Sequence, residues 1–88
     1  MNYHFITRLA ERYNIYIDRK QYDAILYGAL ESSPILIEEN GEEWHKVYYK
    51  GAWLYVLLRY RRGYGDELAT VITKQDMDRK LALAKKVL

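Results

Sequence analysis

The chain has no cysteine and a single proline among its 88 residues. Without cysteine, neither a disulfide framework nor a thiolate metal site can form. A cytoplasmic location is then the simplest expectation. No apolar run approaches the ~18 residues that span a bilayer, and the N-terminus lacks a signal-peptide pattern, so we expect no membrane association. Walker loops, dinucleotide fingerprints and nucleophile elbows are also missing, and the two histidines lack metal-ligand spacing. We therefore predict no cofactor and no metal.

Acidic residues are absent from one long stretch of the chain, residues 44–64. That stretch contains five lysines or arginines and seven tyrosines or tryptophans, although the net charge of the chain is only +2. The preceding residues 31–43 have the opposite pattern, with five glutamates and no base. Cations neutralise phosphates and aromatic rings stack on bases, so residues 44–64 indicate a nucleic-acid partner. The alternative is that these charges form a solvated face.

The length and the apolar content of 50% predict one folded domain, residues 1–88. Apolar residues recur at helical spacing in three segments. Asp18 and Gln21 stand at capping-box positions before the second of these segments. The predicted helices are Asn2–Tyr13, Arg19–Leu30 and Lys74–Val87.

Between the second and third helices the sequence predicts four strands joined by short turns. Asn40-Gly41 is a strong hairpin signal, and Gly51, Gly63 and Gly65 mark the other turns. Short connections favour an antiparallel meander, so the fold class is α+β in the order α-α-β-β-β-β-α. The predicted strands are Ile35–Glu39, Glu42–Lys50, Ala52–Tyr60 and Glu67–Thr73.

Alternation along the strands divides the side chains between two faces. The aliphatic set of Leu54, Val56 and Leu58 is expected against the first two helices, with Leu68 on the other face. That other face would carry Lys46, Tyr48, Trp53, Tyr55, Arg59 and Thr70. Small folds bind RNA on such faces. The alternative is that the last helix or a second subunit covers the rings. The predicted nucleic-acid contacts are Lys46, Tyr48, Tyr55, Arg61, Arg62 and Arg12.

His4 and Arg8 stand four residues apart on the first helix, where their side chains share one face. A histidine beside guanidinium groups suits a general base near neutral pH, and arginine binds phosphate through its fork. The pair is a minimal set for metal-independent RNA cleavage, with Thr70 as a hydroxyl that positions the phosphate. The alternative is that His4 is an ordinary surface residue. His45 in the second strand is expected to be structural.

A set of short motifs resembles the small stand-alone domains of the barnase–EndoU–colicin–RelE superfamily. The motifs are His4-x3-Arg8-Leu9-x-Glu11-Arg12, Ile15-x-Ile17, a hairpin with Val47 and Gly51, Leu54-x-Val56 and Leu68-x-Thr70-Val71. The resemblance implies a two-helix start, a four-stranded meander and, in cleaving members, ribonuclease activity of toxins from toxin–antitoxin or phage-conflict systems. By position it implies catalytic roles for His4, Arg8, Thr70 and, as the sheet cation, Arg59.

Three functional hypotheses follow from the sequence. The first is a small metal-independent ribonuclease, possibly a toxin. The second is a non-catalytic phage- or plasmid-type protein that binds and inhibits a host protein or nucleoprotein complex, because tyrosine and tryptophan dominate binding hot spots. The third is an RNA- or DNA-binding module without cleavage. RNA, an antitoxin or a host target is the expected partner, and a homodimer through the aromatic sheet face is compatible with the first two.

Overall fold

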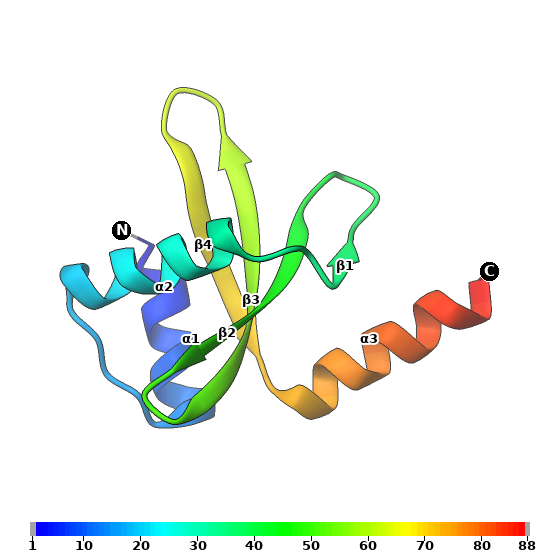
Figure 1. Ribbon diagram of the computed structural model, residues 1–88, viewed down its shortest axis with the longest axis horizontal. Helices are drawn as coiled ribbons and strands as arrows, with labels where there is room; N and C mark the ends of the chain where they lie inside the picture. The colour runs from blue at the N-terminus through cyan, green and yellow to red at the C-terminus, as the bar shows by residue number, and fades with distance from the viewer. Residues whose placement is uncertain (1, 88) are drawn as a thin grey trace.

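The computed structural model describes residues 2–87 (Figure 1). Its helices and strands follow the predicted order, and the sheet is an antiparallel meander with strand order β1-β2-β3-β4, so the α+β fold class is confirmed. Among the described helices, none has both the length and the hydropathy to cross a bilayer. The elements are α1 Tyr3–Tyr13, α2 Arg19–Glu31, β1 Leu36–Ile37, β2 Glu43–Tyr49, β3 Ala52–Arg61, β4 Gly65–Ile72 and α3 Lys74–Val87.

The helix ends are capped by residues that satisfy the backbone groups there, and the capping box before the second helix was predicted from the sequence. Asp18 accepts the backbone N–H of Gln21 at 2.9 Å, and Gln21 accepts the N–H of Asp18 at 2.9 Å, which confirms the capping box. Asn14 ends α1 in the left-handed conformation, with φ 54°. Thr73 directly precedes α3 and caps it, because its hydroxyl accepts the N–H of Asp76 at 3.3 Å. These caps satisfy backbone groups that a helix end otherwise leaves unpaired.

The main core lies between one face of the sheet and the first two helices. α1 packs along β4, and α2 packs along β2 and β3. Burying this apolar surface is the main stabilising contribution to the fold. The buried residues are Phe5, Leu9, Tyr22, Ile25, Ala29, Val47, Leu54, Val56, Leu58, Leu68 and Val71.

A second, smaller core lies on the opposite face of the sheet, beneath α3. Trp44, Tyr55, Ile72 and Met77 are buried there, and Leu36, Leu57 and Leu81 pack partly against them. α3 begins directly after β4 and crosses this face before it extends beyond the sheet (Figure 1). Helices therefore lie on both faces, and only part of the second face is open.

A β-bulge in β4 corrects the predicted placement of Leu68. Leu57 pairs with Thr70 but Leu58 pairs with Leu68, so Ala69 is an extra residue in β4. An extra residue reverses the alternation beyond it. Leu68 therefore lies in the main core together with Val71, whereas simple alternation places the two on opposite faces. The buried N–H of Leu68 donates to the hydroxyl of Tyr22 at 2.9 Å.

Candidate nucleic-acid interface

Two half-exposed aromatic rings and a lysine form what we call the Trp53 cluster: Lys46, Tyr48 and Trp53. Tyr48 and Trp53 are directly opposite each other on β2 and β3. Their ring centroids lie 5.1 Å apart with an interplanar angle of 70°. The Nζ atom of Lys46 lies 4.3 Å from the centroid of the Trp53 ring. Tyr48 is 59% exposed and Trp53 is 49% exposed. This arrangement presents a positive charge and two ring surfaces to solvent.

The turn between β2 and β3 sets the geometry of this cluster. Lys50 and Gly51 both have positive φ, at 48° and 80°. Such a two-residue turn matches the twist of the strands and fixes their register. The register pairs Tyr49 with Ala52 and, next along the hairpin, Tyr48 with Trp53. The two rings are thus held on paired strands rather than on a loop.

The acidic part of the chain lies at the other end of β2. Glu42 precedes β2 and Glu43 begins it, whereas Tyr48 stands near its end. A strand rises about 3.3 Å per residue, so Glu43 and Tyr48 lie roughly 17 Å apart along β2. The carboxylate of Glu38 is also engaged, with hydrogen bonds from the Trp44 indole at 2.7 Å and from Lys80 at 3.3 Å. These contacts, first that from Trp44, hold the pKa of Glu38 below its usual value.

Tyr55 is not available for stacking on a base, contrary to the sequence prediction. It is 7% exposed and lies in the second core with Trp44, Ile72 and Met77. The reason is α3, which returns across the sheet after Thr73 and covers this ring. The alternative interpretation, that the last helix covers part of the aromatic face, thus holds for Tyr55 but not for the Trp53 cluster.

The arginines of the β3–β4 hairpin have acidic or aromatic neighbours. The Nε atom of Arg59 lies 2.6 Å from the Glu67 carboxylate, and that of Arg61 lies 3.6 Å from the same oxygen. The guanidinium of Arg61 also lies 5.4 Å from the ring centroid of Tyr64. Arg62 is exposed in the turn that follows β3. Phosphate binding by Arg59 would have to displace Glu67.

The basic residues of α1 are engaged within the fold, and His4 is exposed. Arg8 pairs with Glu11 at 2.6 Å, one turn along the same helix. Arg12 donates to the carbonyl of Val71 at the end of β4. His4 presents an exposed side chain near the start of the helix, with its backbone N–H bonded to the side chain of Asn2. Within residues 2–87, none of the side-chain hydrogen bonds joins His4 to Arg8 or Arg12.

The four residues predicted to be catalytic divide between the two layers of the molecule. His4 and Arg8 lie on α1, which packs on the main-core face of the sheet. Thr70 is opposite Leu57, and Arg59 is opposite Glu67, on the face that α3 partly covers. The structure thus brings Arg59 and Thr70 to one face and leaves His4 and Arg8 in the helical layer. A shared catalytic role for these residues stays a prediction.

His45 is a buried polar residue, and the hydrogen-bond partners of its ring could not be predicted from the sequence. It is 2% exposed, with Nδ1 at 3.0 Å from the Ser32 hydroxyl and Nε2 at 2.9 Å from the Glu43 carboxylate. Ser32 follows α2, so His45 ties the end of that helix to β2. Both ring nitrogens have partners, which supports the expected structural role.

Within the described part of the chain, no group of three or more histidine, cysteine or acidic side chains lies close enough to hold a metal ion. Comparison with protein-family models, with curated proteins and with solved structures found no match to this chain. The resemblance to the barnase–EndoU–colicin–RelE superfamily therefore stays a prediction from the sequence, and the fold and the Trp53 cluster are the basis for a functional proposal.

Proposed function

We propose that this protein binds single-stranded RNA through the Trp53 cluster. The observation that carries the proposal is the pair of half-exposed rings of Tyr48 and Trp53 with the Lys46 ammonium against one of them. Bases of any sequence stack on aromatic rings, and a neighbouring cation neutralises the phosphate that follows. Single-stranded RNA is the form whose bases are free to stack in this way.

Two further features support a nucleic-acid ligand. The cluster stands on paired strands, so stacking on it requires little ordering of the protein. Residues 44–64, which carry the cluster, contain five basic residues and no acid, and the acidic hairpin lies at the far end of β2. A protein partner held by buried rings is the competing interpretation, and the salt dependence of binding distinguishes the two.

Intrinsic tryptophan fluorescence provides a direct test. Trp53 is 49% exposed, whereas Trp44 is 3% exposed and serves as an internal reference. Titration with a short single-stranded RNA is expected to quench the Trp53 emission, and the Trp53→Phe variant, which keeps only Trp44, should show no quenching. The same titration with single-stranded DNA and with duplex RNA measures how strongly the protein prefers single-stranded RNA. Absence of quenching with any of these nucleic acids would contradict the proposal.

Substitution in the cluster supplies the energetic test. Stacking on one ring contributes about 1–3 kcal/mol, so Trp53→Ala should raise the Kd for RNA by roughly 5- to 150-fold. Tyr64→Ala is the matched control, because Tyr64 is 85% exposed but lies on the other hairpin. Lys46→Gln should weaken binding. It should also reduce the slope of log K against log salt concentration by the amount expected for about one phosphate contact. Equal losses in the Trp53 and Tyr64 variants would refute the assignment to the cluster.

Cleavage of RNA, as by a ribonuclease-like toxin, is the second candidate function. The exposed side chain of His4 supports it, because a general base must reach the ribose 2′-hydroxyl. Incubation of mixed RNA with the protein in EDTA, beside His4→Ala, tests this candidate. Cleavage by the wild type alone, leaving 2′,3′-cyclic phosphate ends, would support it. Equal cleavage by both proteins would contradict a role for His4.

A further inference from the structure

Three side chains at the end of α2 and the start of β2 form a chain of hydrogen bonds that we call the Ser32 relay: Ser32, His45 and Glu43. The hydroxyl of Ser32 lies 3.0 Å from Nδ1 of His45, and Nε2 of His45 lies 2.9 Å from the Glu43 carboxylate. His45 and Lys46 are neighbours on β2, so their side chains point to opposite faces of the sheet. The relay is therefore separate from the Trp53 cluster and from the proposed RNA interface.

The hydrogen atoms of the relay can be assigned from the partners of each group. The Glu43 carboxylate accepts hydrogen bonds, so a neutral His45 ring carries its hydrogen on Nε2 and presents the lone pair of Nδ1 to Ser32. The Ser32 hydroxyl also lies 2.9 Å from the Ala29 carbonyl. That carbonyl already accepts the backbone N–H of Ser32 at 3.2 Å, so it keeps a donor when the hydroxyl hydrogen turns to Nδ1. In that state the serine donates to the imidazole, and the imidazole donates to a carboxylate.

This is the arrangement of a nucleophilic hydroxyl with its general base. A serine hydroxyl is a weak nucleophile until a neighbouring base removes its proton, and a carboxylate on the far side of the imidazole holds the base in the required tautomer. The Glu43 carboxylate would also stabilise the imidazolium that forms. Because His45 is 2% exposed, water screens these interactions less than it would at the surface.

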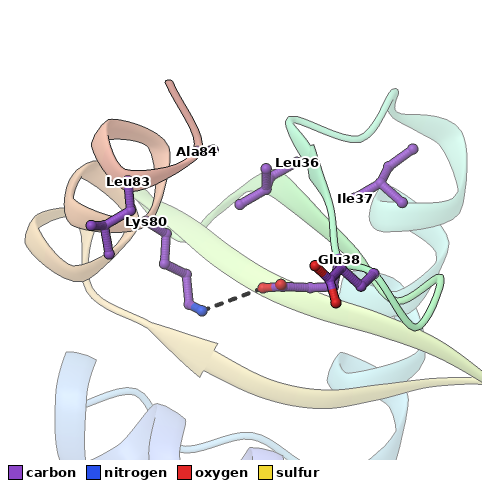
Figure 2. A pocket seen from close by; sticks show the side chains of 7 residues that line it. Leu36, Ile37, Glu38, Lys80, Leu83 and Ala84 are labelled. Atoms are coloured by element: carbon purple, nitrogen blue, oxygen red, sulfur yellow. Dashed lines mark hydrogen bonds and ion pairs between the residues drawn. The ribbon is translucent and has the colours of Figure 1, made fainter. Parts of the chain in front are cut away.

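The position of Ser32 suits a small reaction partner. Ser32 is half-buried, and Ser33 and Pro34, which follow it, are exposed. The relay residues do not line the groove between β1 and α3, whose walls carry Leu36 and Lys80 (Figure 2). The hydroxyl is thus close to solvent but outside this groove, which favours a small donor over a large substrate.

We propose that Ser32 is an activated nucleophile that accepts the acyl group of a small activated ester or thioester, with His45 as the general base and Glu43 as the residue that orients it. The Oγ atom of Ser32 forms a bond to the carbonyl carbon of the donor, and the bond from that carbon to the leaving oxygen or sulfur breaks. The hydroxyl proton passes to Nδ1 of His45 and from there to the leaving group. The products are an acylated Ser32 and a free alcohol or thiol.

Acetylation by p-nitrophenyl acetate, mapped by fragment-ion mass spectrometry, tests the proposal. Ser33 is the internal control, because it is exposed but stands outside the relay. General-base catalysis contributes about 10²- to 10⁴-fold, so Ser32 should be acetylated at least about 100-fold faster than Ser33. In urea, where the relay is lost, the two serines should react at equal rates. Equal rates in the folded protein would overturn the proposal.

Substitution of Glu43 tests whether the relay is the cause of the reactivity. Glu43→Gln keeps an oxygen that can accept from Nε2 but removes the negative charge, so acetylation of Ser32 should slow by at least about tenfold. Glu42→Gln is the matched control, because the Glu42 carboxylate accepts from the Asn40 amide at 2.9 Å, and its rate should equal that of the wild type. Circular dichroism verifies that both variants are folded. Equal acetylation of Ser32 in the two variants would overturn the role of the relay.

Discussion

The hydroxyl of Tyr22 holds the bulged part of β4, and its removal tests how the main core is stabilised. Tyr22 is 4% exposed, and its hydroxyl accepts the N–H of Leu68 beside the extra residue Ala69. The substitution Tyr22→Phe keeps the ring and its edge-on contact with Phe5, whose centroid is 5.7 Å away. It leaves the Leu68 N–H buried without this partner.

The expected loss of stability follows from the removal of that single hydrogen bond. A buried donor left without a partner costs about 1–3 kcal/mol in the free energy of unfolding. In a domain of this size each kcal/mol changes Tm by about 4–8 °C, so Tm should fall by roughly 4–24 °C. Tyr27→Phe is the matched control, because Tyr27 lies on the same helix but is 65% exposed. Its effect should stay within about 0.5 kcal/mol.

Two measurements decide the outcome. Urea unfolding of both variants gives the change in the free energy of unfolding, and amide hydrogen exchange reports on the Leu68 N–H itself. Exchange at Leu68 should be faster in Tyr22→Phe than in the wild type. If Tyr22→Phe is as stable as Tyr27→Phe and the Leu68 amide stays protected, the hydroxyl does not hold the bulge.

Three further predictions concern packing and pH. A Cβ at Gly28 would lie 3.0 Å from Val47 Cγ1, so Gly28→Ala should lower the free energy of unfolding by up to about 2 kcal/mol, although alanine has the higher helix propensity. The same substitution should be tolerated when Val47 is also replaced by alanine, as urea unfolding of the two variants would show. Because the pKa of Glu38 is lowered in the folded state, the stability it contributes is lost as pH falls below 4.5, and Glu38→Gln should reduce the fall in Tm between neutral and acidic pH. Burial raises the pKa of Tyr13 above its usual 10.0, so stability should decrease as pH rises beyond that value, and Tyr13→Phe should show a smaller decrease by circular dichroism.

The element order could be predicted because its signals are local. The capping box of Asp18 and Gln21, the Asn40-Gly41 turn and the period of the apolar residues each depend on a few neighbouring residues. The side of the sheet on which Leu68 lies could not be predicted, because the bulge at Ala69 depends on how β4 pairs with β3 and on the hydroxyl of Tyr22 from α2. Distant contacts of this kind leave no periodic pattern in the sequence.

The candidate site could be predicted only in part, because some of its features also depend on contacts between distant residues. Alternation placed Lys46, Tyr48 and Trp53 on one face, and the structure brings these three together. The covering of Tyr55 depends on the direction in which α3 leaves Thr73, which composition does not specify. The pairing of Arg59 with Glu67 follows from the register of the β3–β4 hairpin, so an exact turn assignment would have found it.

The contacts that α1 makes with the end of β4 also bear on aggregation. β4 is an outer strand of the sheet, and outer strands are templates for uncontrolled strand addition between molecules. Arg12 donates to the carbonyl of Val71, and the hydroxyl of Tyr13 donates to that of Ile72 at 2.6 Å. These side chains occupy carbonyls at the C-terminal end of β4, so they oppose the addition of another chain at that end of the edge. The opposite outer strand, β1, is only two residues long and pairs with Glu43 and Trp44 alone, so the rest of β2 forms the outer edge on that side and is the part of the sheet more open to strand addition.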